Sequence, residues 1–247
     1  MPIAIIPSRY GSSRLQGKPL ISVAGRPMIQ RVYEQARKSS AATQVWVATD
    51  DARIVAAVDA FGGNALMTSD TCRSGTDRVA ETANILNLAP EDIVINIQGD
   101  QPVFDPRSID DLIAPFDRNP DLVMSTLAFK IQDKREITDP KDVKVTFDIR
   151  GNALYFSRAQ IPFPRDEKTQ TDYYKHLGFY AYKKSFLDLF VTLPTGRYEA
   201  VEKLEQLRAL EHGFSIQVAV TRFDSPEVDL PEDICRVERL ISGTSGS

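Results

Sequence analysis

The first half of the chain alternates short apolar runs with longer stretches in which apolar residues recur every three or four positions. The short runs predict strands at 3–7, 45–49, 64–67 and 92–98. The longer stretches predict helices that begin near Pro27 and that span about 52–61 and 77–86. Strands that alternate with helices in this way are typical of a mostly parallel sheet flanked by helices, a Rossmann-like α/β fold.

The pattern changes after about Leu122, where apolar runs follow one another without a long helix between them. These runs predict strands at 123–129, 143–148 and 153–156, and Arg150-Gly151-Asn152 predicts a hairpin turn between the last two. No linker rich in Pro, Ser or Gly separates them from the first half. We therefore expect residues 122–182 to extend the main sheet with antiparallel strands and not to fold as a second domain.

Helical periodicity returns in the last third, so we expect a single domain over residues 1–241. Helices are predicted at 184–191 and 199–211, with Gly213 ending the second. A strand at 216–220 follows, and then a helix with Pro231 at its first position. The small, polar segment 242–247 is expected to be disordered.

Composition narrows the range of partners. The chain has 247 residues, with 30 Lys and Arg against 34 Asp and Glu, and a net charge of −4. Without a cationic surplus, broad binding to nucleic acid or to anionic membranes is not expected. No apolar run approaches the roughly 20 residues of a membrane span, and the first residues lack the features of a signal peptide. Cys72 and Cys235 form no CxxC motif, so we expect a cytoplasmic protein with free thiols.

The loop at residues 7–20 directly follows the first predicted strand, which is where α/β sheets place their ligands. It carries glycines and serines, whose backbone N–H groups can face an anion. It also carries three cationic side chains, Arg9, Arg14 and Lys18. This combination predicts a cradle for a triphosphate, and the alternative is a solvated basic loop without function.

The same loop is not a Walker A motif. Five residues, instead of four, separate Gly11 from Gly17 and Lys18. Pro19 also stands where that motif places a magnesium-binding Ser or Thr. The magnesium ligand of a Walker A site is therefore missing from this loop.

The pattern strand-R-x-x-S-x-R-x-x-x-K-P-L in this loop is similar to the opening of sugar nucleotidyltransferases, specifically the cytidylyltransferases for sialic acid and for 3-deoxy-manno-octulosonate (Kdo). The resemblance to CMP-Kdo synthetases continues in segments at 48–50, 74–78, 96–100, 153–158, 176–178, 204–208 and 228–233. Each segment alone is a weak signal, and together they are specific. The resemblance implies the nucleotide-diphospho-sugar transferase type of α/β fold. It also implies formation of CMP-Kdo and pyrophosphate from CTP and Kdo, for lipopolysaccharide biosynthesis.

The resemblance also implies which residues bind CTP. They lie in the first loop, at the start of the predicted helix 77–86 and after the strand at 92–98: Pro7, Arg9, Ser12, Arg14, Lys18, Ser74, Gly75 and Asp100. Lys18, Arg9 and Asp100 are the ones expected to act in catalysis. Ser74 or Thr76 would equally serve as a helix cap, and the two roles can coexist.

An acidic residue at a strand end provides a candidate metal ligand. Asp100 follows the strand at 92–98 and should emerge at the same sheet edge as the first loop. Carboxylates suit Mg²⁺, which prefers oxygen ligands and keeps room for substrate phosphates. The resemblance implies Mg²⁺ as the cofactor, with Asp100 as one ligand and Asp229 as the second. The alternative role for Asp229 is a helix N-cap ahead of Pro231.

The resemblance assigns five polar residues to the pocket for the sugar acid: Arg78, Gln98, His176, Glu205 and Gln206. Without it, a lone histidine among apolar residues, such as His176, is more often structural. The residues identify no general base for the sugar hydroxyl, and a metal-bound hydroxyl with a lowered pKa would not need one.

Three positions depart from the common pattern of CMP-Kdo synthetases. Gln101 stands where Glu is expected, Ala181 where Gly is usual, and Gly196-Arg197-Tyr198 where Pro-Leu is usual. All three flank segments of the implied sugar pocket. A branch of the family uses the 8-amino-8-deoxy analogue of Kdo. The sequence therefore leaves the substituent at C8 of the substrate undetermined, whereas the expected reaction is the same for both sugars.

Two alternative functions remain open at this point, and the chain is expected to form a homodimer. A cytidylyltransferase for sialic acid or methylerythritol phosphate would share the loop and the fold, but the latter type should lack the segments around His176 and Glu205-Gln206. A non-catalytic nucleotide-binding module should have lost Lys18 or Asp100. We also expect a homodimer through residues 122–182, because their apolar sequences exceed what one sheet face needs to bury and because the resemblance implies it.

Overall fold

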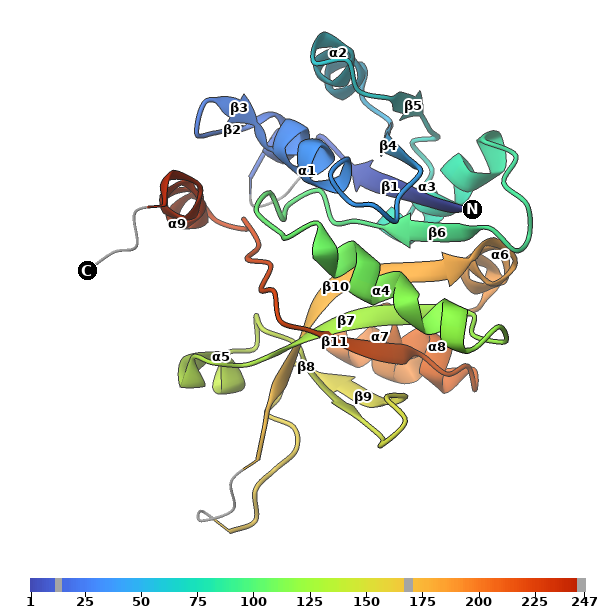
Figure 1. Ribbon diagram of the computed structural model, residues 1–247, viewed down its shortest axis with the longest axis vertical. Coiled ribbons are helices and arrows are strands. Elements are labelled where there is room, and N and C mark those ends of the chain that lie inside the picture. The colour runs from blue at the N-terminus through green and yellow to red at the C-terminus, as the bar shows by residue number, and fades with distance from the viewer. Residues whose placement is uncertain (12–14, 167–170, 244–247) are drawn as a thin grey trace.

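A computed structural model describes residues 1–11, 15–166 and 171–243 of the chain (Figure 1). The predictions for Ser12, for Arg14 and for most of the segment 242–247 lie outside the described residues. Within these ranges, no helix has the length and apolar character needed to cross a bilayer.

The centre of the molecule is a sheet with the strand order β11-β7-β10-β6-β1-β4-β5. These strands are β1 (Pro2–Ser8), β4 (Gln44–Thr49), β5 (Ala65–Met67), β6 (Ile93–Asn96), β7 (Met124–Lys130), β10 (Tyr174–Lys183) and β11 (Gln217–Thr221). Strands β6, β1, β4 and β5 pair in parallel, and β11 is parallel to β7. The predicted mostly parallel sheet is therefore confirmed.

Helices cover both faces of this sheet (Figure 1). Alternate residues of β1 point to opposite faces: Ile3 and Ile5 belong to one core cluster, and Ala4 and Ile6 to the other. The first cluster includes side chains of α3 (Gly75–Ile85), α6 (Lys184–Thr192) and α8 (Leu207–Glu211). The second includes side chains of α1 (Met28–Ala36), α2 (Ala52–Ala60) and α4 (Arg107–Arg118).

The predicted antiparallel portion is part of the same sheet. β10 runs antiparallel to both of its neighbours, β6 and β7. The predicted hairpin joins β8 (Lys144–Phe147) and β9 (Ala153–Ser157), with Gly151 at φ +84° in its turn. β8 connects this hairpin to the sheet, because Lys144 pairs with Lys175 of β10.

One predicted helix is wrong. The stretch 199–211 forms two short helices, α7 (Arg197–Glu202) and α8, because Lys203 adopts a left-handed conformation with φ +55° and ends the first. α4 and the short α5 (Lys134–Thr138) are additional to the predicted elements. The last helix, α9 (Pro231–Ser242), has a proline in its first turn, as predicted.

The last helix of the chain lies near the elements that follow the first loop. That loop leads into the short 3₁₀ helix η1 (Lys18–Leu20) and the ribbon of β2 (Ser22–Val23) and β3 (Arg26–Pro27). α9 lies against this ribbon, where the backbone N–H of Ala24 donates to Oε1 of Glu238 at 2.7 Å. The contact brings the segment that precedes α9 beside the first loop.

Candidate active site

Three segments that are far apart in the sequence meet at the carboxyl ends of β1 and β6. The two strands pair in parallel, with Ile5 opposite Asn96. The loop with Lys18 follows β1, and Asp100 follows β6. The segment before α9 reaches the same place, because the backbone N–H of Val228 donates to the carbonyl oxygen of Asp100 at 2.9 Å.

Lys18 lies between the two carboxylates that the sequence nominates as metal ligands. Its ammonium group donates to Oδ2 of Asp100 at 2.7 Å and to Oδ1 of Asp229 at 2.9 Å. The local backbone explains the direction of Lys18: Gly17 has φ +68°, and its N–H donates to the carbonyl oxygen of Tyr10 at 3.0 Å. This turn closes the loop and brings Lys18 back toward the strand ends.

The alternative role of Asp229 as a helix cap is wrong. The N-cap of α9 is Leu230. The side chain of Asp233 accepts the backbone N–H groups of Asp229 at 2.9 Å and of Leu230 at 2.8 Å. The helix start is therefore satisfied by Asp233, and the carboxylate of Asp229 is bonded to Lys18 instead.

The cluster carries more negative than positive charge. Burial, together with the negative charges of Asp100 and Asp229, raises the pKa of the neighbouring Glu227 to about 7. Burial alone would lower the pKa of Lys18, but its two carboxylate partners outweigh burial and raise that pKa. Lys18 is therefore protonated at neutral pH. An excess of carboxylates around one ammonium group favours a further cation.

Mg²⁺ fits the donor set at this edge of the sheet. It is usually held by one or two carboxylates and completed by substrate phosphates and water. Among the residues that the structure describes, no three His, Cys, Asp or Glu side chains are arranged to hold a metal ion by themselves. The Asp100 and Asp229 carboxylates therefore suit a metal that arrives with a phosphate-bearing ligand.

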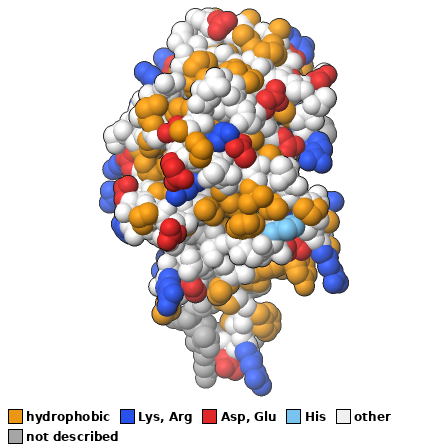
Figure 2. Space-filling view, turned by 90° about the vertical axis from the view of Figure 1, so that its right-hand side faces the viewer, with side chains coloured by type: hydrophobic (Ala, Val, Ile, Leu, Met, Phe, Trp, Pro, Cys, Tyr) orange, Lys and Arg blue, Asp and Glu red, His pale blue; other side chains and the backbone are white. Residues whose placement is uncertain are grey.

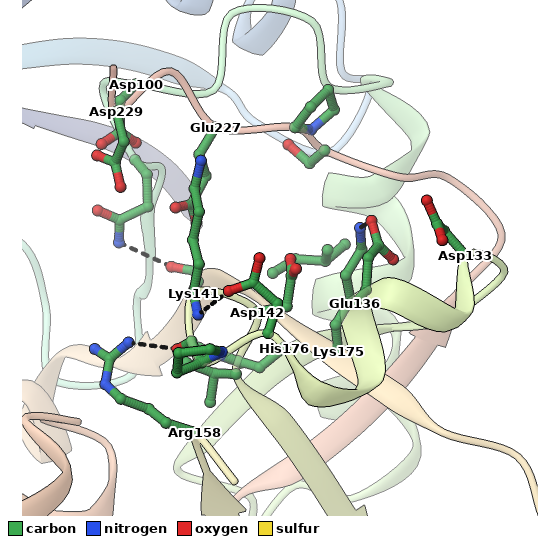
Figure 3. A pocket seen from close by; sticks show the side chains of 18 of the residues that line it. Asp100, Asp133, Glu136, Lys141, Asp142, Arg158, Lys175, His176, Glu227 and Asp229 are labelled. Carbon is green, nitrogen blue, oxygen red and sulfur yellow. Dashed lines mark hydrogen bonds and ion pairs between the residues drawn. The ribbon is translucent and has the colours of Figure 1, made fainter. Parts of the chain in front are cut away.

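A cavity of about 1020 Å³ opens beside this cluster (Figure 3). Asp100 and Asp229 lie together at one side of it, and Glu136 and Lys175 lie at the opposite side. Its lining is mostly polar and charged. A cavity of this kind suits a small, highly polar ligand.

Two of the residues assigned to the sugar pocket, Gln98 and His176, line this cavity. The side-chain amide of Gln98 donates to the carbonyl oxygen of Gly178 at 2.8 Å, which fixes its orientation. Nε2 of His176 lies 2.9 Å from the hydroxyl oxygen of Thr126, and the ring packs edge-on against Phe156. Burial lowers the pKa of His176 to about 3, so its imidazole is neutral at physiological pH.

Four of the residues implied to bind CTP lie together at the start of α3. A Cβ atom at Gly75 would lie 3.4 Å from Cγ of Pro7, so the end of β1 and the start of α3 are in close contact. Arg9 reaches the same place, where its guanidinium group donates to the carbonyl oxygen of Arg73 at 3.4 Å. Ser74 precedes Gly75 and is the N-cap of α3. Ser12 and Arg14 of this loop lie outside the described residues.

Glu205 contacts this end of α3, and neither Glu205 nor Gln206 lines the cavity. The hydroxyl group of Thr76 donates to the carboxylate of Glu205. Burial raises the pKa of Glu205. Gln206 is buried, and its side-chain nitrogen has no hydrogen-bond partner among the described residues. Such a group is available to a ligand.

Arg78 is placed differently from the other residues assigned to the sugar pocket. Arg78 is 0% exposed. Its guanidinium group pairs with Oδ2 of Asp50 at 2.7 Å and also donates to the hydroxyl oxygen of Thr68. This arrangement is a buried ion pair between α3 and the segment after β4. It gives no support to a direct contact between Arg78 and the sugar.

The sequence patterns missed a second charged cluster in the cavity. Lys175 of β10 donates to Glu136 at 2.8 Å and to Asp224 at 3.1 Å. Its one signal in the sequence is a lysine next to His176 in an otherwise apolar strand. Glu227 was also missed, because its proximity to Asp100 depends on the path of the segment before α9.

The comparison with protein families agrees with this geometry. A family model described as "Cytidylyltransferase" matches residues 3–218. The chain belongs to this family of cytidylyltransferases. A solved structure described as CMP:2-keto-3-deoxy-manno-octonic acid synthetase complexed with CTP is 41% identical, with a TM-score of 0.92 over 99% of both chains.

Curated relatives include proteins of two named kinds. The chain is 62% identical to the 3-deoxy-manno-octulosonate cytidylyltransferase of Desulfosudis oleivorans, over 97% of this chain and 96% of that protein. It is 56% identical to the 8-amino-3,8-dideoxy-manno-octulosonate cytidylyltransferase of Shewanella sediminis, over 93% of this chain and 94% of that protein. The resemblance to CMP-Kdo synthetases is thereby confirmed, and both named acceptors occur among the relatives.

Proposed function

We propose that the protein transfers CMP from CTP to Kdo or to its 8-amino-8-deoxy analogue, for lipopolysaccharide biosynthesis. The anomeric 2-hydroxyl oxygen of the sugar attacks the α-phosphorus of CTP, and the bond from that phosphorus to the bridging oxygen of pyrophosphate breaks. The observation that carries this proposal is the Asp100–Lys18–Asp229 cluster beside a polar cavity, in a chain that is 62% identical to a named Kdo cytidylyltransferase.

The proposed CTP site combines the first loop with the start of α3. Pro7, Ser74 and Gly75 bring these two segments into contact, and Arg9 adds a positive charge there. Lys18 would stabilise charge on the phosphates as pyrophosphate leaves. Catalysis of this type depends on positioning and charge neutralisation, and needs no covalent intermediate.

Mg²⁺ is proposed as the cofactor, with Asp100 and Asp229 as its protein ligands. When bound, it would neutralise charge on the phosphates and lower the pKa of the attacking hydroxyl. The protein's own contribution is to hold the two carboxylates side by side at the strand ends.

The acceptor sugar is proposed to occupy the cavity next to Gln98 and His176. A neutral imidazole and an oriented amide can donate to or accept from sugar hydroxyl groups. Gln206, which precedes α8 and has an unpaired buried nitrogen among the described residues, is the other candidate. The substituent at C8 of the sugar is left to experiment.

A homodimer in the cytoplasm is proposed as the working form. Large apolar side chains are exposed on the β8–β9 hairpin and on α7: Ile149, Leu154, Tyr198 and Val201. The rings of Tyr155 and Tyr198 are 6.1 Å apart, so α7 lies beside β9. Hydrophobic side chains also gather on the face that Figure 2 shows. Sedimentation equilibrium should give twice the 27.6 kDa mass of one chain, and a single-chain mass at micromolar concentration would refute the dimer.

Pyrophosphate release with CTP and Mg²⁺ tests the proposed reaction. The panel of acceptors is Kdo, its 8-amino-8-deoxy analogue, sialic acid and methylerythritol phosphate. We expect release with one or both of the first two acceptors, and their kcat/KM values identify the natural substituent at C8. Release only with sialic acid or methylerythritol phosphate would replace the proposed acceptor. No release with any acceptor would favour a non-catalytic nucleotide-binding module.

A further inference from the structure

Lys18 and a divalent cation require the same two carboxylates. The proposed function assigns Asp100 and Asp229 to Mg²⁺, yet both accept a hydrogen bond from the Lys18 ammonium group, at 2.7 and 2.9 Å. The proposed function also assigns Lys18 to the triphosphate. The two carboxylates take two of the three N–H donors of the ammonium group and neutralise its charge, so full use of Lys18 by the phosphates needs a second position of its side chain.

The backbones that carry the two carboxylates are held in place by bonds that do not involve Lys18. The backbone N–H of Val228 donates to the carbonyl oxygen of Asp100 at 2.9 Å, and Asp233 accepts the N–H of Asp229 at 2.9 Å. These bonds tie the segment before α9 to the end of β6. Lys18 is the movable member, because it reaches the carboxylates through a flexible four-carbon stem.

We propose that Lys18 competes with the divalent cation for Asp100 and Asp229, and that the nucleotide ends this competition by binding the ammonium group through its phosphates. The protein alone then binds divalent cations weakly, and cation and nucleotide promote each other's binding. The exchange keeps charges paired, because the ammonium leaves the carboxylates as the cation reaches them. This inference rests on the proposed function, whose metal and phosphate ligands it uses.

Binding of Mn²⁺ to the protein without nucleotide tests the competition directly. Mn²⁺ suits the same oxygen ligands as Mg²⁺, and the electron paramagnetic resonance signal of the free ion reports its binding. We expect Lys18→Met to bind Mn²⁺ about 10- to 100-fold more tightly than the unaltered protein. Lys38→Met removes an exposed lysine of the region after α1 and should bind like the unaltered protein. Equal or weaker binding by Lys18→Met would overturn the proposal.

Thermal unfolding gives a second readout that also reports whether the variants fold. A ligand that binds only the folded protein raises Tm according to its affinity. Mn²⁺ should therefore raise the Tm of Lys18→Met by more than it raises the Tm of the unaltered protein. The same larger rise is expected for Lys18→Gln, whose side chain keeps N–H donors but has no charge. An equal or smaller rise in both variants would contradict the competition.

The double variant Lys18→Met with Asp100→Asn separates this proposal from the metal assignment. We expect it to lose the tight Mn²⁺ binding of Lys18→Met. If it keeps that binding, the ion is bound elsewhere, and the metal assignment fails together with the competition. If Asp100→Asn weakens binding while Lys18→Met does not strengthen it, the metal assignment stands and the competition alone fails.

Discussion

Two lysines each donate to two carboxylates, and parts of both clusters line one cavity: Asp100 and Asp229 lie at one side of it, and Glu136 and Lys175 lie at the opposite side (Figure 3). Lys18 bonds its partners at 2.7 and 2.9 Å, and Lys175 bonds Glu136 and Asp224 at 2.8 and 3.1 Å. For both lysines, burial would lower the pKa, and the carboxylates outweigh it and raise the pKa. Charge and burial alone therefore do not tell the two clusters apart.

The difference lies in how each lysine is held. Lys175 is the second residue of β10, where its backbone pairs with Phe129 of β7 and Lys144 of β8, and its ammonium group lies 5.5 Å from the centre of the Phe129 ring. Lys18 begins the short helix η1 in the loop that follows β1, outside the sheet. A lysine fixed within a sheet stabilises the fold, whereas a lysine on a loop can exchange partners. We infer that the Lys18 cluster takes part in catalysis and that the Lys175 cluster stabilises the fold at the wall of the cavity.

The largest expected effect concerns the carboxylates around Lys18. Asp100→Asn and Asp229→Asn should each lower turnover about a thousandfold, or roughly 4 kcal/mol, because each removes a charged metal ligand. Pyrophosphate release measures the loss, and Tm checks that the fold is intact. Asp59→Asn, at an exposed position of α2, is the matched control and should retain full activity. Near-normal Mg²⁺-dependent turnover in Asp229→Asn would remove it from the metal site.

Lys18→Met should lower kcat/KM for CTP by roughly 10- to 150-fold, because it removes one charge-assisted contact worth about 1.5–3 kcal/mol. The substitution keeps much of the bulk of the stem, so the fold should survive. Lys38→Met should leave kcat/KM unchanged. If both variants match the unaltered protein, Lys18 takes no part in turnover, and the comparison between the two lysines fails.

Lys175→Met should show the reverse pattern. Removing the lysine of a buried ion pair leaves its carboxylates without a compensating charge, which lowers the free energy of unfolding by about 3–5 kcal/mol. The loss should be near the lower end of this range because Asp224 is partly exposed. Chemical denaturation should therefore show about 3 kcal/mol less stability. The folded fraction should keep most of its kcat. A stable Lys175→Met variant with a large loss of kcat would assign Lys175 to the chemistry instead.

Measured per pH unit, the smallest expected effect is a pH dependence caused by His176. Its folded pKa of about 3 lies below the ordinary 6.5, so the unfolded chain binds more protons between these values. Stability should therefore fall as the pH drops below 6.5, by about 1.4 kcal/mol per pH unit. His176→Gln should flatten this loss in unfolding curves between pH 6.5 and 4. The unaltered protein, measured in parallel, gives the reference slope. An unchanged slope in His176→Gln would mean that His176 is not held neutral by the fold.

The sequence predicted most of the sheet, because buried strands such as β1 and β6 are continuous apolar runs. It also placed Lys18 and Asp100 at one edge, because loops after parallel strands emerge together. The Lys175 cluster could not be predicted, since its carboxylates lie 39 and 49 residues away and share no local spacing. The break at Lys203 was missed for a related reason: a single left-handed residue leaves the apolar periodicity unchanged.

Phosphorus-31 spectra of the complete reaction test the central claim most directly. The protein is incubated with CTP, Mg²⁺ and either Kdo or its 8-amino-8-deoxy analogue. We expect the three CTP signals to be replaced by one phosphodiester signal and one pyrophosphate signal in equal molar amounts, and to persist when the sugar is omitted. Unchanged CTP with both sugars, or conversion of CTP to CDP and inorganic phosphate, would contradict the assignment of this chain as a CMP-transferring enzyme for this acceptor.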